Sequence, residues 1–223
     1  MKSKTVQEQA WIDQTAAFVK SKFEGEGTGH DWWHIYRVWK NAQNILDKKS
    51  NMDAFVVEMG ALLHDIADFK FHDGDESVGP KEARKYLHGL GVEPARAEAI
   101  VHIVEHVSYK GAKVANKMKS EEGFVVQDAD RLDAIGAIGV ARTFAYGGSV
   151  GSPMHDPSAT AELHEDFEAY KNSRSSTVNH FYEKLLLLKD MMNTPEAKAI
   201  AEGRHAYMEQ FLQTFYNEWE GKQ

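Results

Sequence analysis

Two histidines and two aspartates, far apart along the chain, are of the types that bind metal ions. His64 and Asp65 are adjacent and follow the small and apolar run 60–63. His34 lies 30 residues before His64, and Asp130 lies 65 residues after Asp65. A single His-Asp pair is more simply explained by a core hydrogen bond and an ion pair. All four residues have apolar neighbours, however, and burying each one unpaired would be costly. One shared ion would satisfy them all.

The elements that must position these residues are helices. Apolar side chains recur at intervals of three and four, and no stretch alternates between apolar and polar residues as an exposed strand would. We therefore expect an all-α fold of about eight or nine helices. Polar, glycine-rich loops are expected at 25–29, 70–79 and 146–157, the last being the best candidate for a lid. The expected helices span 4–23, 31–48, 52–68, 80–89, 94–107, 122–145, 161–171, 176–192 and 195–219.

The composition limits the classes of function. The 223 residues contain no cysteine, which excludes thiol nucleophiles, disulfides and Cys-ligated zinc. A net charge of −8 argues against binding to a nucleic acid polymer or an anionic membrane. The beginning of the chain lacks the apolar core of a signal peptide, so we expect a cytoplasmic protein. We expect one domain over 1–223, with a metal-site core at about 30–145 and C-terminal helices at 158–220 packed on it.

The order His, His-Asp, Asp resembles that of the HD-domain metal-dependent phosphohydrolase superfamily. The likeness extends to a small bacterial single-domain branch linked to nucleotide pyrophosphohydrolysis. The resemblance implies that one divalent ion is bound by His34, His64, Asp65 and Asp130. Two imidazoles and two carboxylates suit transition metals better than Ca²⁺, and we expect manganese, with Ni, Co, Fe, Zn or Mg as alternatives. The segments that carry the resemblance are 29–38, 61–70, 127–136 and 179–186.

Four further residues are candidates for the chemistry. Asp68 lies three residues after Asp65, and the resemblance gives it the role of positioning or deprotonating the attacking water. Lys70, Arg37 and His106 are candidate phosphate contacts. Arg37 could equally form a salt bridge with a ligand carboxylate, and Lys70 could be a solvated charge at a helix end.

The branch that the chain resembles implies hydrolysis of a (deoxy)nucleoside triphosphate to the monophosphate and pyrophosphate. A 5′-nucleotidase and a cyclic nucleotide phosphodiesterase are alternatives within the superfamily, and a non-catalytic nucleotide- or metal-binding regulator is an alternative of another class. The expected partner is a small phosphorylated molecule, and a homo-oligomer stays open. The aromatic pairs Trp32-Trp33 and Phe69-Phe71 could stack a base, but core packing is the default interpretation.

Overall fold

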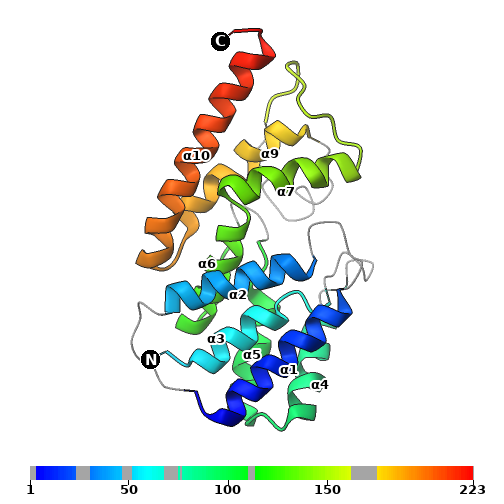
Figure 1. Cartoon of the computed structure of the whole chain (residues 1–223), viewed down its shortest axis with the longest axis vertical. Helices are drawn as coiled ribbons and strands as arrows, with labels where there is room; N and C mark the ends of the chain where they lie inside the picture. Colours follow the sequence, from blue (N-terminus) through cyan, green and yellow to red (C-terminus); the bar gives the residue numbers. More distant parts are fainter. Residues whose placement is uncertain are drawn as a thin grey trace. The chain divides into compact units, whose positions relative to one another are not determined.

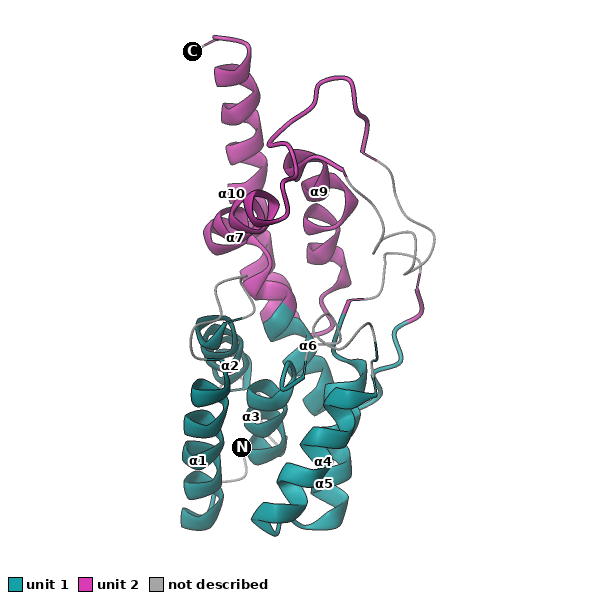
Figure 2. Cartoon of the chain, turned by 90° about the vertical axis from the view of Figure 1, so that its right-hand side faces the viewer, with its two compact units in different colours: residues 1–108, 116–130 teal, residues 109–115, 131–223 magenta. Residues whose placement is uncertain are grey.

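The chain forms two compact units made of helices (Figures 1 and 2). A computed structural model describes residues 4–23, 31–46, 52–67, 75, 77–109, 114–161 and 175–222. Within these residues there are nine α-helices, one 3₁₀ helix and no strand, which confirms the all-α prediction. Unit 1 comprises residues 1–108 and 116–130, and unit 2 comprises 109–115 and 131–223. None of the helices in the described ranges is both long and apolar enough to span a bilayer.

Helix α3 is the central element of unit 1. All ten of its residues are buried, and it packs against α1, α2 and α5, while α4 packs on α5. An all-round apolar helix of this kind is stable only when neighbours cover every face. The helices of unit 1 are α1 (Val6–Lys22), α2 (Trp32–Leu46), α3 (Ala54–Leu63), α4 (Val78–Leu90), α5 (Pro94–His106) and the first part of α6 (Glu121–Asp133).

A network of capping and ion-pair contacts joins three of these helices. Thr5 and Glu8 form a reciprocal capping box at the start of α1. Asp53 caps α3 by accepting hydrogen bonds from the backbone amides of Phe55 and Val56. Arg96 on α5 donates to both Asp53 and Glu8, with Nε lying 2.7 Å from Asp53 Oδ2. One guanidinium thus ties the N-terminal ends of α1 and α3 to α5.

The backbone of α3 approaches α5 closely at Gly60. A Cβ atom at this position would lie 3.1 Å from Cδ1 and 3.2 Å from Cγ2 of Ile103, and 3.4 Å from Cγ2 of Val126 on α6. The absence of a side chain therefore sets the separation of α3 from its neighbours one turn before His64.

Unit 2 is organised around aromatic side chains. Phe144 on α7 contacts Phe181, Phe211 and Phe215 with ring centroids 5.8 to 6.3 Å apart. These spacings are typical of packed aromatic pairs. Beyond the end of α6, the helices of unit 2 are α7 (Gly136–Ser149), α9 (Thr177–Glu183), the 3₁₀ helix η2 (Leu185–Met191) and α10 (Pro195–Trp219).

The prediction of one helix over 122–145 is wrong, because the chain breaks between α6 and α7. The amides of Ala134 and Ile135 bond to carbonyls three residues earlier, which tightens and ends α6. Gly136 then has a φ of +77°, a conformation that glycine adopts without a Cβ penalty. The expected helix at 176–192 is also divided, into α9 and η2. Most of the expected helix at 161–171 lies outside the described residues.

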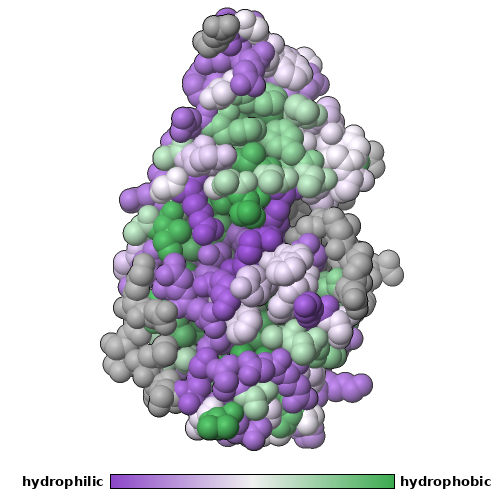
Figure 3. Space-filling model, viewed as in Figure 1, coloured by the Kyte–Doolittle hydropathy of each residue, from purple (hydrophilic) through white to green (hydrophobic). Residues whose placement is uncertain are grey.

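Exposed apolar side chains are concentrated on unit 2, and Figure 3 shows apolar area on the part of the surface that unit 2 forms. The loop after α7, expected as a lid, is attached to this unit by backbone hydrogen bonds from Thr177 to Pro153 and from Val178 to Met154. His155 in the same loop packs edge to face on Trp219 of α10, with ring centroids 4.9 Å apart. Its function as a lid stays a prediction.

Candidate metal centre

His34 reaches the site from the first turn of α2. Its backbone amide donates to the Asp31 carboxylate at 2.9 Å and to the Asp31 carbonyl at 3.1 Å. Asp31 thus acts as an N-terminal cap that fixes where the helix begins. His34 lies on the face that α2 buries with Ile35 and Val38, and only 1% of its surface is exposed. The cap and the apolar face together set the direction of the imidazole.

His64 stands where α3 ends. The sequence predicted a helix to residue 68, but α3 stops at Leu63 and residues 64–67 form turns. The Nδ1 atom of His64 lies 2.8 Å from the carbonyl oxygen of Ala61. Since a carbonyl only accepts hydrogen bonds, Nδ1 carries a proton, and a ring protonated at Nδ1 alone presents the lone pair of Nε2 to the site. A backbone hydrogen bond that fixes the tautomer is typical of metal-binding histidines.

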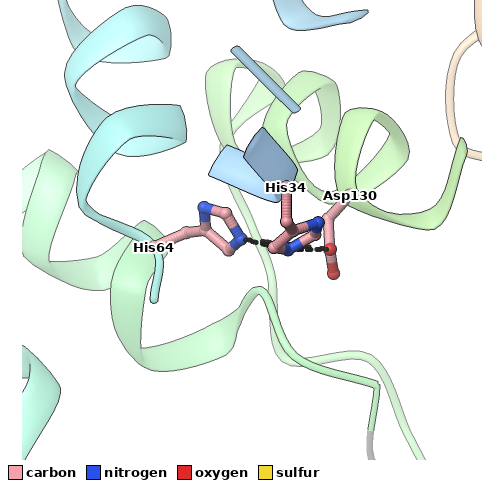
Figure 4. Close-up of side chains that lie close together, drawn as sticks. All are labelled: His34, His64 and Asp130. Atoms are coloured by element: carbon pink, nitrogen blue, oxygen red, sulfur yellow. Dashed lines mark hydrogen bonds and ion pairs between the residues drawn. The ribbon is translucent and has the colours of Figure 1, made fainter. Parts of the chain in front are cut away.

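The four predicted ligands converge in unit 1. The two Nε2 atoms of His34 and His64 are 3.2 Å apart. His34 Nε2 lies 3.5 Å from Asp65 Oδ2 and 3.5 Å from Asp130 Oδ1. His64 Nε2 lies 3.6 Å from Asp65 Oδ2 and 4.0 Å from Asp130 Oδ1. Figure 4 shows the rings of His34 and His64 and the carboxylate of Asp130 directed toward one another.

These distances allow His34, His64 and Asp130 to share a single ion. Two atoms that each bind one ion at about 2.1 Å are at most about 4.2 Å apart, and all five separations are shorter than this limit. Ligand atoms of His34, His64 and Asp130 lie within 4.8 Å of one another. Asp65 is outside this group, although its Oδ2 lies within 3.6 Å of both imidazole nitrogens. The imidazoles are buried, whereas the side chains of Asp65 and Asp130 are 12% and 26% exposed, so the carboxylate side of the cluster has the access to water. An ion bound there would meet solvent on one side.

Two amide side chains, which the sequence analysis missed, support Asp130 on α6. Asn41 on α2 donates from Nδ2 to the carbonyl of Ala129 at 3.3 Å. Gln127 donates from Nε2 to the carbonyl of His106 at 3.2 Å and also bonds to Asn116. Asn41 could have been found from its place seven residues after His34, which is two helical turns. Gln127 gave no such signal beyond its position near Asp130.

The other predicted site residues have different outcomes. Arg37 lies half-buried on α2, three residues after His34. His106 is the last residue of α5, and its ring packs edge to face on His102 with centroids 4.4 Å apart. Asp68 and Lys70 lie outside the described residues, so their roles stay predictions.

Comparison with known proteins identifies the family. The model of the HD domain matches residues 32–135, a segment that contains all four converging residues. A crystal structure of an HD-superfamily hydrolase from Bacillus thuringiensis is 43% identical in sequence, with a TM-score of 0.75, and the match covers 96% of this chain and 100% of that one. The chain belongs to the HD superfamily of hydrolases. The resemblance seen in the motifs is thereby confirmed.

Other relatives match over nearly the whole length. The uncharacterized protein YpgQ of Bacillus subtilis is 38% identical over 201 residues, covering 90% of this chain and 89% of YpgQ. The crystal structure of YpgQ in complex with ADP has a TM-score of 0.75 and 36% identity, covering 96% of this chain and 97% of that structure. The crystal structure of a protein from Lactobacillus plantarum has a TM-score of 0.83 and 33% identity, covering 99% of this chain and all of that one.

Proposed function

We propose that this HD protein is a divalent-metal-dependent phosphohydrolase that cleaves nucleoside triphosphates, deoxynucleotides among them, to the monophosphate and pyrophosphate. The observation that carries the proposal is that each of two imidazole nitrogens in unit 1 lies within 4.0 Å of the other and of two carboxylates. The structure of YpgQ with ADP supports a nucleotide as the substrate class. Manganese is our first choice of ion, since the mixed nitrogen and oxygen donors suit it.

The ligands determine what the ion can do. His34, His64, Asp65 and Asp130 would hold it, and two neutral imidazoles with two carboxylates balance its double positive charge. A bound divalent ion lowers the pKa of water and neutralises phosphoryl oxygens. The hydrogen bond from His64 to Ala61 keeps the imidazole oriented before substrate arrives, which avoids reorganisation during the reaction.

The remaining residues move the proton and hold the phosphates. In our proposal the oxygen of water attacks the α-phosphorus, the bond from that phosphorus to the bridging oxygen breaks, and pyrophosphate leaves. Asp68 accepts the proton of the attacking water, a role that the resemblance to the superfamily gives it. Lys70, Arg37 and His106 offset the negative charge of the polyphosphate.

The test is a product analysis with a matched pair of variants. Metal-loaded protein is incubated with nucleoside tri-, di-, mono- and cyclic phosphates, and the products are separated by ion-exchange chromatography. We expect pyrophosphate from triphosphates, whereas inorganic phosphate from monophosphates would indicate a 5′-nucleotidase. Conversion of cyclic nucleotides to monophosphates would indicate a phosphodiesterase. Nucleotide binding without turnover with any metal would indicate the regulator.

The variants test the site itself. Asp65→Asn removes one ligand charge, and Asp190→Asn removes an exposed carboxylate of η2 as the control. We expect Asp65→Asn to lose metal binding in calorimetry and to lose hydrolysis, with an unchanged helical circular dichroism spectrum. Asp190→Asn should retain both. Full activity in Asp65→Asn would contradict the proposed site.

A further inference from the structure

Trp33 is an exposed aromatic side chain next to a residue of the metal centre. It immediately precedes His34 at the start of α2, and 57% of its surface is exposed. Core packing was the default interpretation of the Trp32-Trp33 pair, and for Trp33 that interpretation is wrong. Burial of this large apolar ring would stabilise the protein, and an exposed indole contributes little of that free energy. Its exposed ring is therefore available to a ligand.

The helical geometry of α2 connects Trp33 to the metal centre. Residues three and four apart are neighbours on a helix surface. Arg37 lies three residues after His34 and four after Trp33, so its side chain lies on the face between them. Exposure increases across this face, from 1% at His34 through the half-buried Arg37 to 57% at Trp33. The three side chains form a strip that leads from the centre to the solvent.

The indole has a flat face available for stacking. Within the described part of the chain its ring contact is with Tyr36, at a centroid distance of 5.8 Å and an interplanar angle of 81°. An edge-on contact covers at most one face of the indole. The next aromatic residues on this helix differ in being half-buried, and the Lys40 ammonium lies 5.5 Å from the Tyr36 ring centre and 4.8 Å from that of Trp39.

We propose that Trp33 stacks on the base of the bound nucleotide and makes the enzyme select nucleotides over polyphosphates that lack a base. This inference rests on the proposed function. A nucleotide with its phosphates at the metal centre extends its base away from the ion, and the strip ends in an aromatic plane at the exposed side. Base stacking on an aromatic side chain tolerates any base because each base has a π-face.

The experiment compares two substrates with the same phosphoanhydride chemistry. The kcat/KM values for a deoxynucleoside triphosphate and for inorganic tripolyphosphate are measured with wild type, Trp33→Leu, Trp33→Phe and Trp219→Leu. We expect the ratio of the two values to fall roughly tenfold in Trp33→Leu, mainly through KM for the nucleotide. Trp33→Phe, which retains an aromatic face, should recover most of the ratio. Trp219→Leu changes a tryptophan of unit 2 that is 46% exposed, and should keep the wild-type ratio.

A binding measurement separates this inference from the proposed function. Calorimetric titration with ADP and with inorganic pyrophosphate should show about a tenfold loss of ADP affinity relative to pyrophosphate in Trp33→Leu. If wild type hydrolyses nucleotides but Trp33→Leu keeps both ratios, stacking by Trp33 is refuted and the function stands. If wild type hydrolyses no nucleotide, the proposed function is refuted. The role of Trp33 then depends on whether Trp33→Leu loses ADP affinity relative to pyrophosphate. Absence of ADP binding by wild type would refute the role of Trp33 as well.

Discussion

Replacing Gly60 by alanine tests how tightly α3 is packed in unit 1. The substitution favours the helix by about 1 kcal/mol, because alanine has the higher helix propensity. The new methyl group, however, would lie 3.1 and 3.2 Å from two atoms of Ile103. Ile103 is fully buried and cannot turn away without disturbing other core residues. Overpacking of this kind costs about 1 to 3 kcal/mol. We therefore expect Gly60→Ala to lower the free energy of unfolding by about 1 kcal/mol.

A double-mutant cycle identifies the clash. Ile103→Val removes Cδ1, the nearest atom, and by itself costs about 1 kcal/mol. In the double variant the methyl group of alanine occupies part of the released space, so the combined loss should be smaller than the sum by about 0.5 to 1 kcal/mol. Gly89→Ala on α4 is the control, because a Cβ there would contact nothing within 4 Å. This control should stabilise the protein by up to about 1 kcal/mol.

The assay is urea unfolding followed by circular dichroism, with a chelator present so that metal binding does not contribute to stability. A Gly60→Ala variant more stable than wild type would refute the reasoning. The reasoning would also be refuted if the loss of unfolding free energy in the double variant equalled the sum of the two single losses to within about 0.3 kcal/mol. Because His64 lies one turn after Gly60, Gly60→Ala should also weaken metal binding, which calorimetry measures.

Three further predictions concern the metal ion, the turn at Gly136 and the loss of stability at acidic pH. Manganese at a hundredfold excess over its dissociation constant should stabilise wild type by about 2.7 kcal/mol, and Asp65→Asn should abolish the resulting rise in melting temperature. Gly136→Ala should cost at least about 1 to 2 kcal/mol in urea unfolding, since φ is +77° and the new methyl would lie 2.9 Å from Arg204 Cγ. Hydrogen bonds from the Thr5 amide and Arg96 hold the pKa of Glu8 below its ordinary value of 4.5. The stability from this carboxylate is therefore complete above that value and is lost as pH falls through the lowered pKa. Glu8→Gln should thus be destabilised at pH 7, and the difference from wild type should shrink as the pH is lowered below 4.5.

Local signals predicted the helices that have clear ends. Pro195 after the capping residue Thr194 predicted the start of α10, and the helix spans Pro195–Trp219 as expected. The expected segment 94–107 likewise differs from α5 by one residue. The break before Gly136 could not be predicted, because glycines are also tolerated inside helices and only the packing of Arg204 against that position distinguishes the two cases.

The sequence predicted which side chains lie close together, but not the residues that support them. The order of the histidines and aspartates indicated a shared ligand, and the distances among His34, His64, Asp65 and Asp130 bring them together as expected. Metal binding itself stays a proposal. The burial of Trp33 was wrongly predicted because a helical period shows which residues share a face but leaves the edge of the buried face undefined. The role of Asp68 stays a prediction.

The hydrogen bond between His64 and Ala61 makes a metal ligand part of the end of a helix. A descendant of this protein that had lost its activity would no longer need Asp65, whose carboxylate faces the site. It would still gain stability from the imidazole that satisfies the Ala61 carbonyl. During divergence, His64 should therefore persist longer than Asp65. In a survey of related genomes, retention of the aspartate would be the better marker of a working enzyme.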